Sequence, residues 1–101
     1  MVRHMLFITY TDEVRQNRAD EATAALKQTF SNMAGKIPGL RKAEFGKNIA
    51  GGRYDACLYC EFDKPEDIPA YRLHPLHSAL EEMANSWVKS NACVDYIVDE
   101  Q

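Results

Sequence analysis

The residues of this chain best suited to acid–base chemistry lie close together, between Tyr71 and His77. A neutral imidazole can accept a proton near neutral pH, and a tyrosine hydroxyl can polarise a carbonyl or stabilise an oxyanion. The His74-Pro75 pair predicts a break between two helical pieces, with His77 in the first turn of the second piece and Tyr71 one turn before the break. The helix dipole disfavours a charged imidazole there, which favours the neutral, proton-accepting form of His77.

His4 is the remaining histidine with a place in this chemistry. It lies on a predicted N-terminal strand and shares one face of that strand with Leu6 and Ile8. If this face packs against the helices, His4 and His77 reach the same cavity. We therefore treat His4, Tyr71 and His77 as candidate catalytic residues. The alternative for His4 is a hydrogen-bonded residue of the core.

Structural roles compete for the other residues of the cluster. Tyr71 can be a core aromatic residue whose hydroxyl contacts water. His74 precedes a proline and can serve to end a helix. His74 and His77 lie three residues apart but offer only two metal ligands, with no acidic partner in a fixed position, so we predict no metal site. No phosphate-binding glycine loop or nucleophile elbow occurs in the sequence, and we predict no cofactor.

The chain has three cysteines. Cys57 and Cys60 have the spacing of a redox motif, but they fall in a strand-like run, where side chains three residues apart point to opposite faces. An odd number of cysteines, together with an N-terminus that begins as a strand and not as a signal peptide, favours free thiols. We therefore expect a cytosolic protein with no disulfide.

Length and charge narrow the class of protein further. The chain of 101 residues predicts a single domain over residues 1–101. Its net charge is −3, and no basic patch runs along it, which argues against a nucleic-acid partner. No apolar run approaches the ~20 residues that a membrane-spanning helix needs, so we predict no membrane span.

The pattern of apolar residues predicts alternating strands and helices. The predicted strands are 2–10, 40–49, 54–62 and 92–98, and the predicted helices are 13–34, 66–73 and 75–89. The order is β-α-β-β-α-β, with the second helical segment broken in two. This order predicts an α+β protein with a ferredoxin-like fold and one antiparallel four-stranded sheet.

Local signals support the boundaries of the helices. Thr11 or Asp12 can cap the first helix, and Asp63 can cap the second. Gly35 is a natural helix stop, and Ser90 is expected to end the last helix. Each long helix has an apolar stripe at helical spacing. The stripes are Val14, Ala22, Leu26, Phe30 and Met33 in the first long helix, and Leu76, Leu80, Met83 and Trp87 in the last.

The first strand is apolar on both faces, with Leu6 and Ile8 on one side and Met5 and Phe7 on the other. Helices cover only one face of a four-stranded sheet of this kind. A solvated second face would alternate more cleanly between apolar and polar residues. Local packing under the C-terminal tail is one explanation. We favour the other, a second copy of the chain laid on the open face to form a homodimer.

The sequence resembles the stress-responsive dimeric α/β-barrel (Dabb) family over nearly its whole length. The matching stretches are VRHMLF at 2–7, KIPGL at 36–40 leading to FGKN at 45–48, and AYRLHPLH at 70–77 closing with VDY at 94–96. The resemblance implies the ferredoxin-like fold and pairing into a dimeric α/β barrel. It leaves activity open, since many members have no assigned reaction.

One plant member of this family is a polyketide cyclase that closes a linear polyketone by an aldol step. By resemblance, His77 would remove the α-proton, Tyr71 would hold the carbonyl oxygen, and His4 would assist or orient.

Three functions follow from these observations. The first is a stress-type dimeric barrel protein that binds a small apolar molecule between sheet and helices. The second is a cofactor-independent enzyme of the polyketide-cyclase kind, which uses His77 as general base with Tyr71 and His4. The third is a structural or interaction dimer with a filled core. A cavity between the sheet and the helices separates the first two functions from the third.

Overall fold

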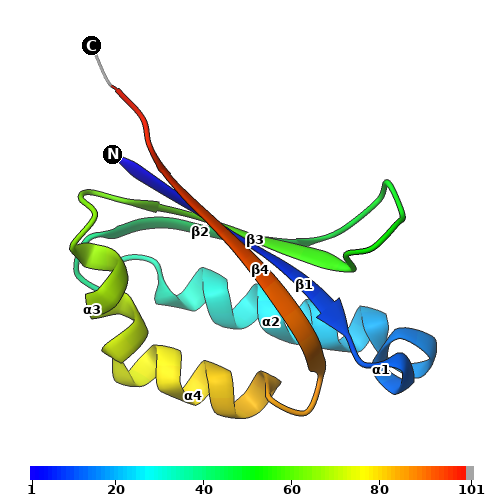
Figure 1. Ribbon diagram of the computed structural model, residues 1–101. Coiled ribbons are helices and arrows are strands. Elements are labelled where there is room, and N and C mark those ends of the chain that lie inside the picture. Colours follow the sequence, from blue (N-terminus) through cyan, green and yellow to red (C-terminus); the bar gives the residue numbers. More distant parts are fainter. Residues whose placement is uncertain (100–101) are drawn as a thin grey trace.

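The computed structural model describes residues 1–99 and has the predicted ferredoxin-like fold (Figure 1). The elements are β1 (Val2–Tyr10), α1 (Asp12–Asn17), α2 (Ala19–Met33), β2 (Leu40–Lys47), β3 (Ala56–Phe62), α3 (Asp67–Leu73), α4 (Pro75–Ala84) and β4 (Val88–Ile97). The strands form one sheet in the order β2-β3-β1-β4, and each neighbouring pair is antiparallel. The predicted fold class is confirmed.

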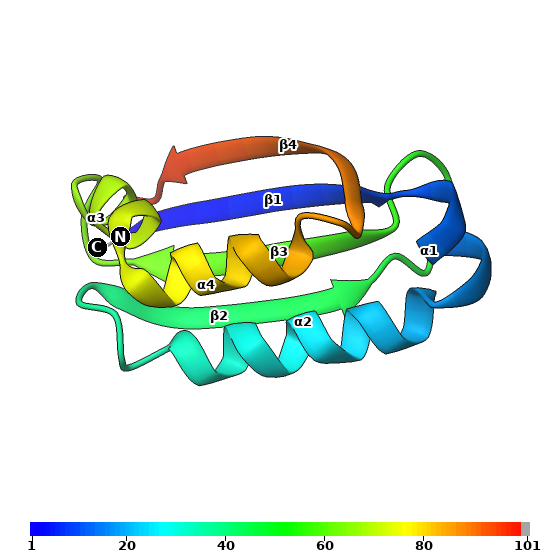
Figure 2. The same cartoon turned by 90° about the horizontal axis from the view of Figure 1, so that it is seen from below.

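Helices α2 and α4 cover the same face of the sheet, as Figure 2 shows from the helical side. Helix α2 presents its predicted apolar stripe to β2, and the ring of Phe30 stacks on Phe45 with 5.4 Å between centroids. Helix α4 buries Leu80. The core therefore lies between this helical layer and the inward side chains of the sheet.

The predicted helix 13–34 is wrong as a single helix. Thr11 caps α1 as predicted, because its hydroxyl accepts a hydrogen bond from the N–H of Val14. The helix then breaks at Arg18, whose backbone leaves the helical region (φ −143°, ψ 20°). The Arg18 guanidinium pairs with Glu13 at 2.8 Å. The break lets α1 carry the chain around the end of β1 before α2 crosses the sheet (Figure 1).

The predicted C-terminal boundary is also wrong. Helix α4 ends at Ala84, so Trp87 lies in the turn after it, and β4 begins at Val88. The N–H of Thr11 donates to the carbonyl of Trp87 at 2.9 Å, and β4 pairs with β1 from Tyr10 onward. Pairing with β1 supplies backbone hydrogen bonds that a longer helix would forgo.

Two loops depart from the predicted local structure. Asp63 does not cap a helix, because its carboxylate pairs with Arg41 at 2.6 and 2.9 Å. The loop between β2 and β3 is longer than predicted, and the Asn48 side chain holds it by donating to the carbonyls of Gly51 and Tyr54.

The turn at Gly39 requires a glycine. Its φ is +84°, and a side chain there would overlap the carboxylate of Asp67. That carboxylate accepts a hydrogen bond from the N–H of Lys64 at 3.1 Å. The close approach of Gly39 to Asp67 therefore holds the turn before β2 against the start of α3.

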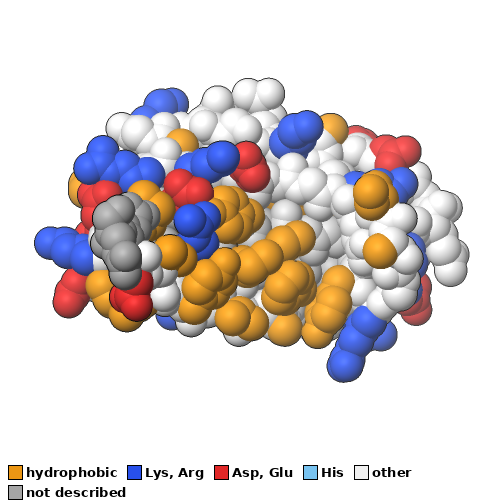
Figure 3. Space-filling model, turned by 90° about the horizontal axis from the view of Figure 1, so that it is seen from above, with side chains coloured by type: hydrophobic (Ala, Val, Ile, Leu, Met, Phe, Trp, Pro, Cys, Tyr) orange, Lys and Arg blue, Asp and Glu red, His pale blue; other side chains and the backbone are white. Residues whose placement is uncertain are grey.

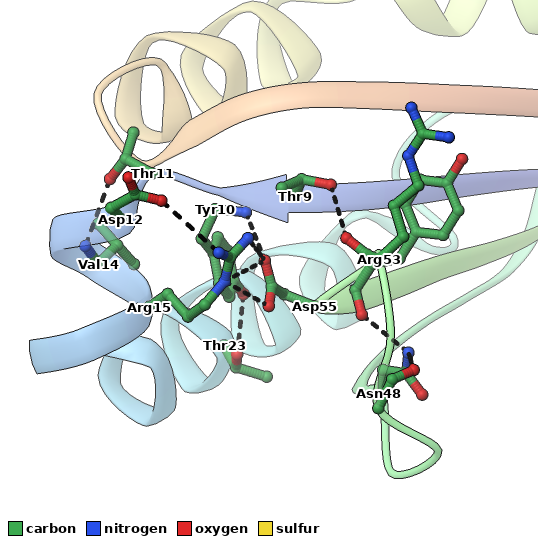
Figure 4. Close-up of polar contacts among 12 residues, drawn as sticks. Thr9, Tyr10, Thr11, Asp12, Val14, Arg15, Thr23, Asn48, Arg53 and Asp55 are labelled. Atoms are coloured by element: carbon green, nitrogen blue, oxygen red, sulfur yellow. Dashed lines mark hydrogen bonds and ion pairs between the residues drawn. The ribbon is translucent and has the colours of Figure 1, made fainter.

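A hydrogen-bonded network surrounds the C-terminal end of β1, at Tyr10 (Figure 4). Asp55 accepts from Arg15 at 3.0 Å and from the backbone N–H of Tyr10 at 2.8 Å. The hydroxyl groups of Tyr10 and Thr23 lie 2.8 Å apart. Burial works against the charge of Asp55, but Arg15 and the Tyr10 N–H outweigh it and lower the pKa of that carboxyl.

The second face of the sheet carries no helix, and apolar side chains gather on it (Figure 3). Met5 on β1 lies between Tyr59 on β3 and Val94 on β4 in the register of the sheet. The Val94 side chain is 50% exposed. Polar contacts on this face join Arg3 to Tyr59 and Glu61, and Lys42 to Glu44. Among residues 1–99, no helix has the length and apolar character to cross a membrane.

Candidate functional site

A cavity of about 410 Å³ lies between the sheet and the helical layer. Its walls come from β1, α2, α4 and the edge strand β4, with Tyr71 at the end of α3. The apolar lining residues are Leu6, Ile8, Leu26, Phe30, Leu80, Ala84 and Val88. The polar ones are His4, Tyr71, Arg72, His77, Glu81, Asn85, Asn91 and Cys93. The three candidate residues His4, Tyr71 and His77 therefore contact one cavity.

Strand β1 turns His4 toward the helices, and only 3% of the residue is exposed. Asp95 is its direct partner across the β1–β4 pair, so the two side chains lie on the same face of the sheet. Nδ1 of His4 lies 2.5 Å from Oδ1 of Asp95. This contact fixes the imidazole ring and leaves Nε2 without a hydrogen-bond partner within residues 1–99.

Tyr71 lies in the last turn of α3 and is 2% exposed. Its ring packs edge-on against Phe62 at 5.3 Å and against His4 at 6.1 Å between centroids. The hydroxyl makes no hydrogen bond to any described residue. Burial raises the pKa of Tyr71, so the hydroxyl stays protonated and can donate a hydrogen bond to a bound molecule.

His77 is the third residue of α4, and its ring lies 4.5 Å from the ring of Tyr71. Burial lowers the pKa of His77, and the nearby carboxylate of Glu81 only partly opposes this effect. Oε1 of Glu81 lies 3.2 Å from Nδ1 of His77, but the buried nitrogen lacks a hydrogen bond of good geometry. A neutral imidazole therefore lies beside a protonated phenol, which suits proton transfer to and from a carbonyl compound.

A sequence model of the stress-responsive A/B barrel domain (Dabb) matches residues 2–98. The chain belongs to the Dabb family. The family resemblance read from the sequence is thereby confirmed.

Known proteins similar to this Dabb chain include enzymes and several proteins of unknown function. Olivetolic acid cyclase from Cannabis sativa is 22% identical over 99 residues, which cover 94% of each chain. A dimeric ferredoxin-like protein of unknown function from Bacteroides fragilis is 31% identical, with a TM-score of 0.84 over 94% of this chain and 93% of that one. A second such dimeric protein, from Thermobifida fusca, is 23% identical, with a TM-score of 0.76 over 96% and 90% of the two chains.

His74 has a structural role in this Dabb chain. Its backbone N–H donates to the carbonyl of Tyr71 at 3.1 Å, which ends α3. Its Nδ1 accepts from the N–H of Leu76 at 3.1 Å, which caps α4. The residue therefore sets the turn that brings Tyr71 and His77 together.

Sequence reasoning missed several polar residues of the site, among them Cys93 at the cavity and Asp95 beside His4. Cys93 and Asp95 come close to His4 because β4 pairs with β1 in a register that no local pattern encodes. Sγ of Cys93 lies 3.5 Å from Nδ1 of His4. Arg72 also lines the cavity, and its position beside Tyr71 in the motif was the available signal.

Cys57 and Cys60 do not form a redox pair, although they have the spacing of one. The three cysteines are free, and Cys60 faces the core whereas Cys57 lies on the opposite face of β3. Burial raises the pKa of Cys60 to about 12, which keeps it an unreactive thiol.

Proposed function

We propose that this Dabb protein binds a small, largely apolar molecule that carries a carbonyl or hydroxyl group. The observation that carries the proposal is the cavity of about 410 Å³, which falls within the size range of ligand pockets. Apolar side chains of α2, α4 and β1 supply a continuous part of its lining, and the hydroxyl of Tyr71 has no protein partner among the described residues. A filled core, which the structural-dimer alternative requires, does not agree with such a cavity.

Calorimetric titration with a panel of small aryl ketones and phenols tests this proposal. Ala84→Phe fills the cavity from α4, and Ala79→Phe places the same ring on the exposed side of that helix as a control. We expect saturable binding by the wild type and Ala79→Phe, and loss of binding in Ala84→Phe. Equal binding by all three proteins, or no binding by the wild type, contradicts the proposal.

A second candidate function is cofactor-independent acid–base catalysis on a carbonyl compound. The specific support is the pairing of a neutral His77 with the protonated hydroxyl of Tyr71, at 4.5 Å between rings. His77 would take a proton from the carbon beside the carbonyl, and Tyr71 would donate a hydrogen bond to the developing enolate oxygen. His4, oriented by Asp95, would position the same substrate. The similarity to olivetolic acid cyclase is consistent with this chemistry.

Hydrogen–deuterium exchange at the α-carbon of a bound ketone, followed by NMR in D₂O, tests the catalytic proposal. We expect exchange by the wild type and loss of exchange in His77→Ala, with ketone binding retained. Glu82→Ala is the control, because Glu82 is an exposed residue of the same helix that does not line the cavity, and this variant should exchange as the wild type does. Exchange that is as fast in His77→Ala as in the wild type would rule out His77 as the base and leave only the binding function.

We further propose that the protein is a cytosolic homodimer, with a second copy on the open face of the sheet. The exposed apolar residues of that face, the dimeric relatives and the three free cysteines support this. Sedimentation of Val94→Asp should show a monomer, because a buried charge would face the partner. Ile49→Asp, in the exposed β2–β3 loop, should remain a dimer. A monomeric wild type would contradict the proposal.

A further inference from the structure

Three potential metal ligands meet at the wall of the cavity formed by β1 and β4. Cys93 and Asp95 are alternate residues of β4, so their side chains leave the same face of the sheet. His4 lies directly across from Asp95 on β1. Nδ1 of His4, Sγ of Cys93 and a carboxylate oxygen of Asp95 all lie within 4.8 Å of one another. We propose that these three atoms bind a zinc ion.

The spacing of the three atoms agrees with a tetrahedral zinc site. Bond lengths of about 2.3 Å to sulfur and about 2.0–2.2 Å to nitrogen and oxygen place the ligand atoms about 3.3–3.6 Å apart. Sγ of Cys93 lies 3.5 Å from Nδ1 of His4 and 3.5 Å from Oδ1 of Asp95. The third separation, from His4 to Asp95, is 2.5 Å, so zinc requires the carboxylate to move outward. Asp95 has room for this movement, because its side chain is 35% exposed on the edge strand.

The chemistry of the ligand set suits zinc better than magnesium or calcium. A thiolate and an imidazole are the donors that zinc favours, whereas the hard divalent cations select oxygen ligands. The thiolate of Cys93 and the carboxylate of Asp95 together balance the two positive charges of the ion. Burial, and then the charge of Asp95, raise the pKa of the Cys93 thiol, so zinc must displace the thiol proton. The charge of Arg72 nearby works in the opposite direction and favours the thiolate.

The three protein ligands leave one coordination position of the zinc ion unfilled by the protein. His4 and Cys93 both line the cavity, and three protein ligands leave the fourth corner of a tetrahedron for water or a ligand oxygen. Tyr71 lines the same cavity, with its ring 6.1 Å from that of His4. The proposed zinc site therefore keeps one open coordination position, and zinc binding there does not require an apolar molecule in the cavity.

Titration of the chelator-treated protein with Co²⁺ alone tests the inference, with Zn²⁺ then added to displace it. We expect a thiolate-to-cobalt charge-transfer band in the wild type, its loss in Cys93→Ala, and its retention in Cys57→Ala. Cys57 is the matched control, because it is a free, partly buried thiol on the other face of the sheet. In competition with a chelating dye, Zn²⁺ affinity should fall at least about tenfold in Cys93→Ala and in Asp95→Asn.

A wild type without a charge-transfer band would overturn the inference. So would a Cys57→Ala variant that loses the band as Cys93→Ala does, or Zn²⁺ affinity that is unchanged in Cys93→Ala. Asp95→Asn keeps the shape of the side chain and guards against an effect of misfolding. No organic ligand enters the experiment, so its failure and the failure of the proposed ligand binding are distinguishable.

Discussion

Similar residue types lie near the two ends of strand β1, but their side chains differ in hydrogen bonding. At one end Tyr10 is 1% exposed and its hydroxyl lies 2.8 Å from that of Thr23. Near the other end Tyr71, which packs against His4, is 2% exposed and its hydroxyl has no hydrogen bond to a described residue. An aspartate pairs with Arg15 at the first end, and another pairs with the buried imidazole of His4 at the second.

This difference indicates that the polar groups at one end of β1 stabilise the fold and that those at the other end can bind a ligand. Buried polar groups that are fully paired add stability and fix one conformation. A buried imidazole nitrogen without a well-formed hydrogen bond, as at His77, destabilises the free protein but is available to a ligand. The hydroxyl of Tyr71, which has no hydrogen bond to a described residue, is available in the same way. We therefore expect substitutions at the Tyr10 end to alter unfolding, and substitutions at the Tyr71 end to alter binding.

The largest effect is expected from Asp55→Ala. This change removes the partner of Arg15 and leaves the backbone N–H of the buried Tyr10 without an acceptor. The free energy of unfolding should fall by about 2–3 kcal/mol, measured by urea denaturation. Asp20→Ala is the control, because Asp20 forms only an exposed ion pair with Lys47, and its effect should stay below about 0.5 kcal/mol. Equal effects of the two changes would mean that the network is not the stabilising feature.

The same substitution at the two tyrosines gives a sharper comparison. Tyr10→Phe removes a paired hydroxyl and should lower the free energy of unfolding by about 1 kcal/mol. Tyr71→Phe removes an unpaired hydroxyl, so stability should stay the same or rise slightly, while ketone binding weakens. Urea denaturation and calorimetric titration measure the two quantities. A larger loss of stability in Tyr71→Phe than in Tyr10→Phe would reverse the comparison.

The smallest expected effect is a pH dependence that comes from His77. Burial lowers its pKa in the folded protein below the value of about 6.5 in the unfolded chain. The unfolded chain therefore binds the proton first, and stability is lost as pH falls from about 6.5 toward the folded pKa. His77→Gln should remove this part of the pH dependence, measured by thermal unfolding. NMR titration should place the His77 midpoint below 6.5, and a midpoint above it would mean that Glu81 outweighs burial.

Local signals in the sequence were enough to predict the order of the elements and much of the candidate site. The apolar stripe from Ala22 to Met33, the Thr11 cap and the break before Pro75 all act within a few residues, so a single chain reveals them. Alternation along β1 was enough to place His4 on one face with Leu6 and Ile8, and the structure shows that this face packs against the helices. The spacing from Tyr71 to His77 was enough to expect them on either side of one helix junction.

The tertiary structure alone decided the break at Arg18, the early end of α4 and the neighbours of His4. Trp87 left its helical stripe because β4 gains a full ladder of hydrogen bonds with β1. Asp95 and Cys93 meet His4 only through the register of that ladder, which joins the first strand of the chain to the last. Residues so far apart in sequence share no local pattern, so their meeting depends on how the whole sheet assembles.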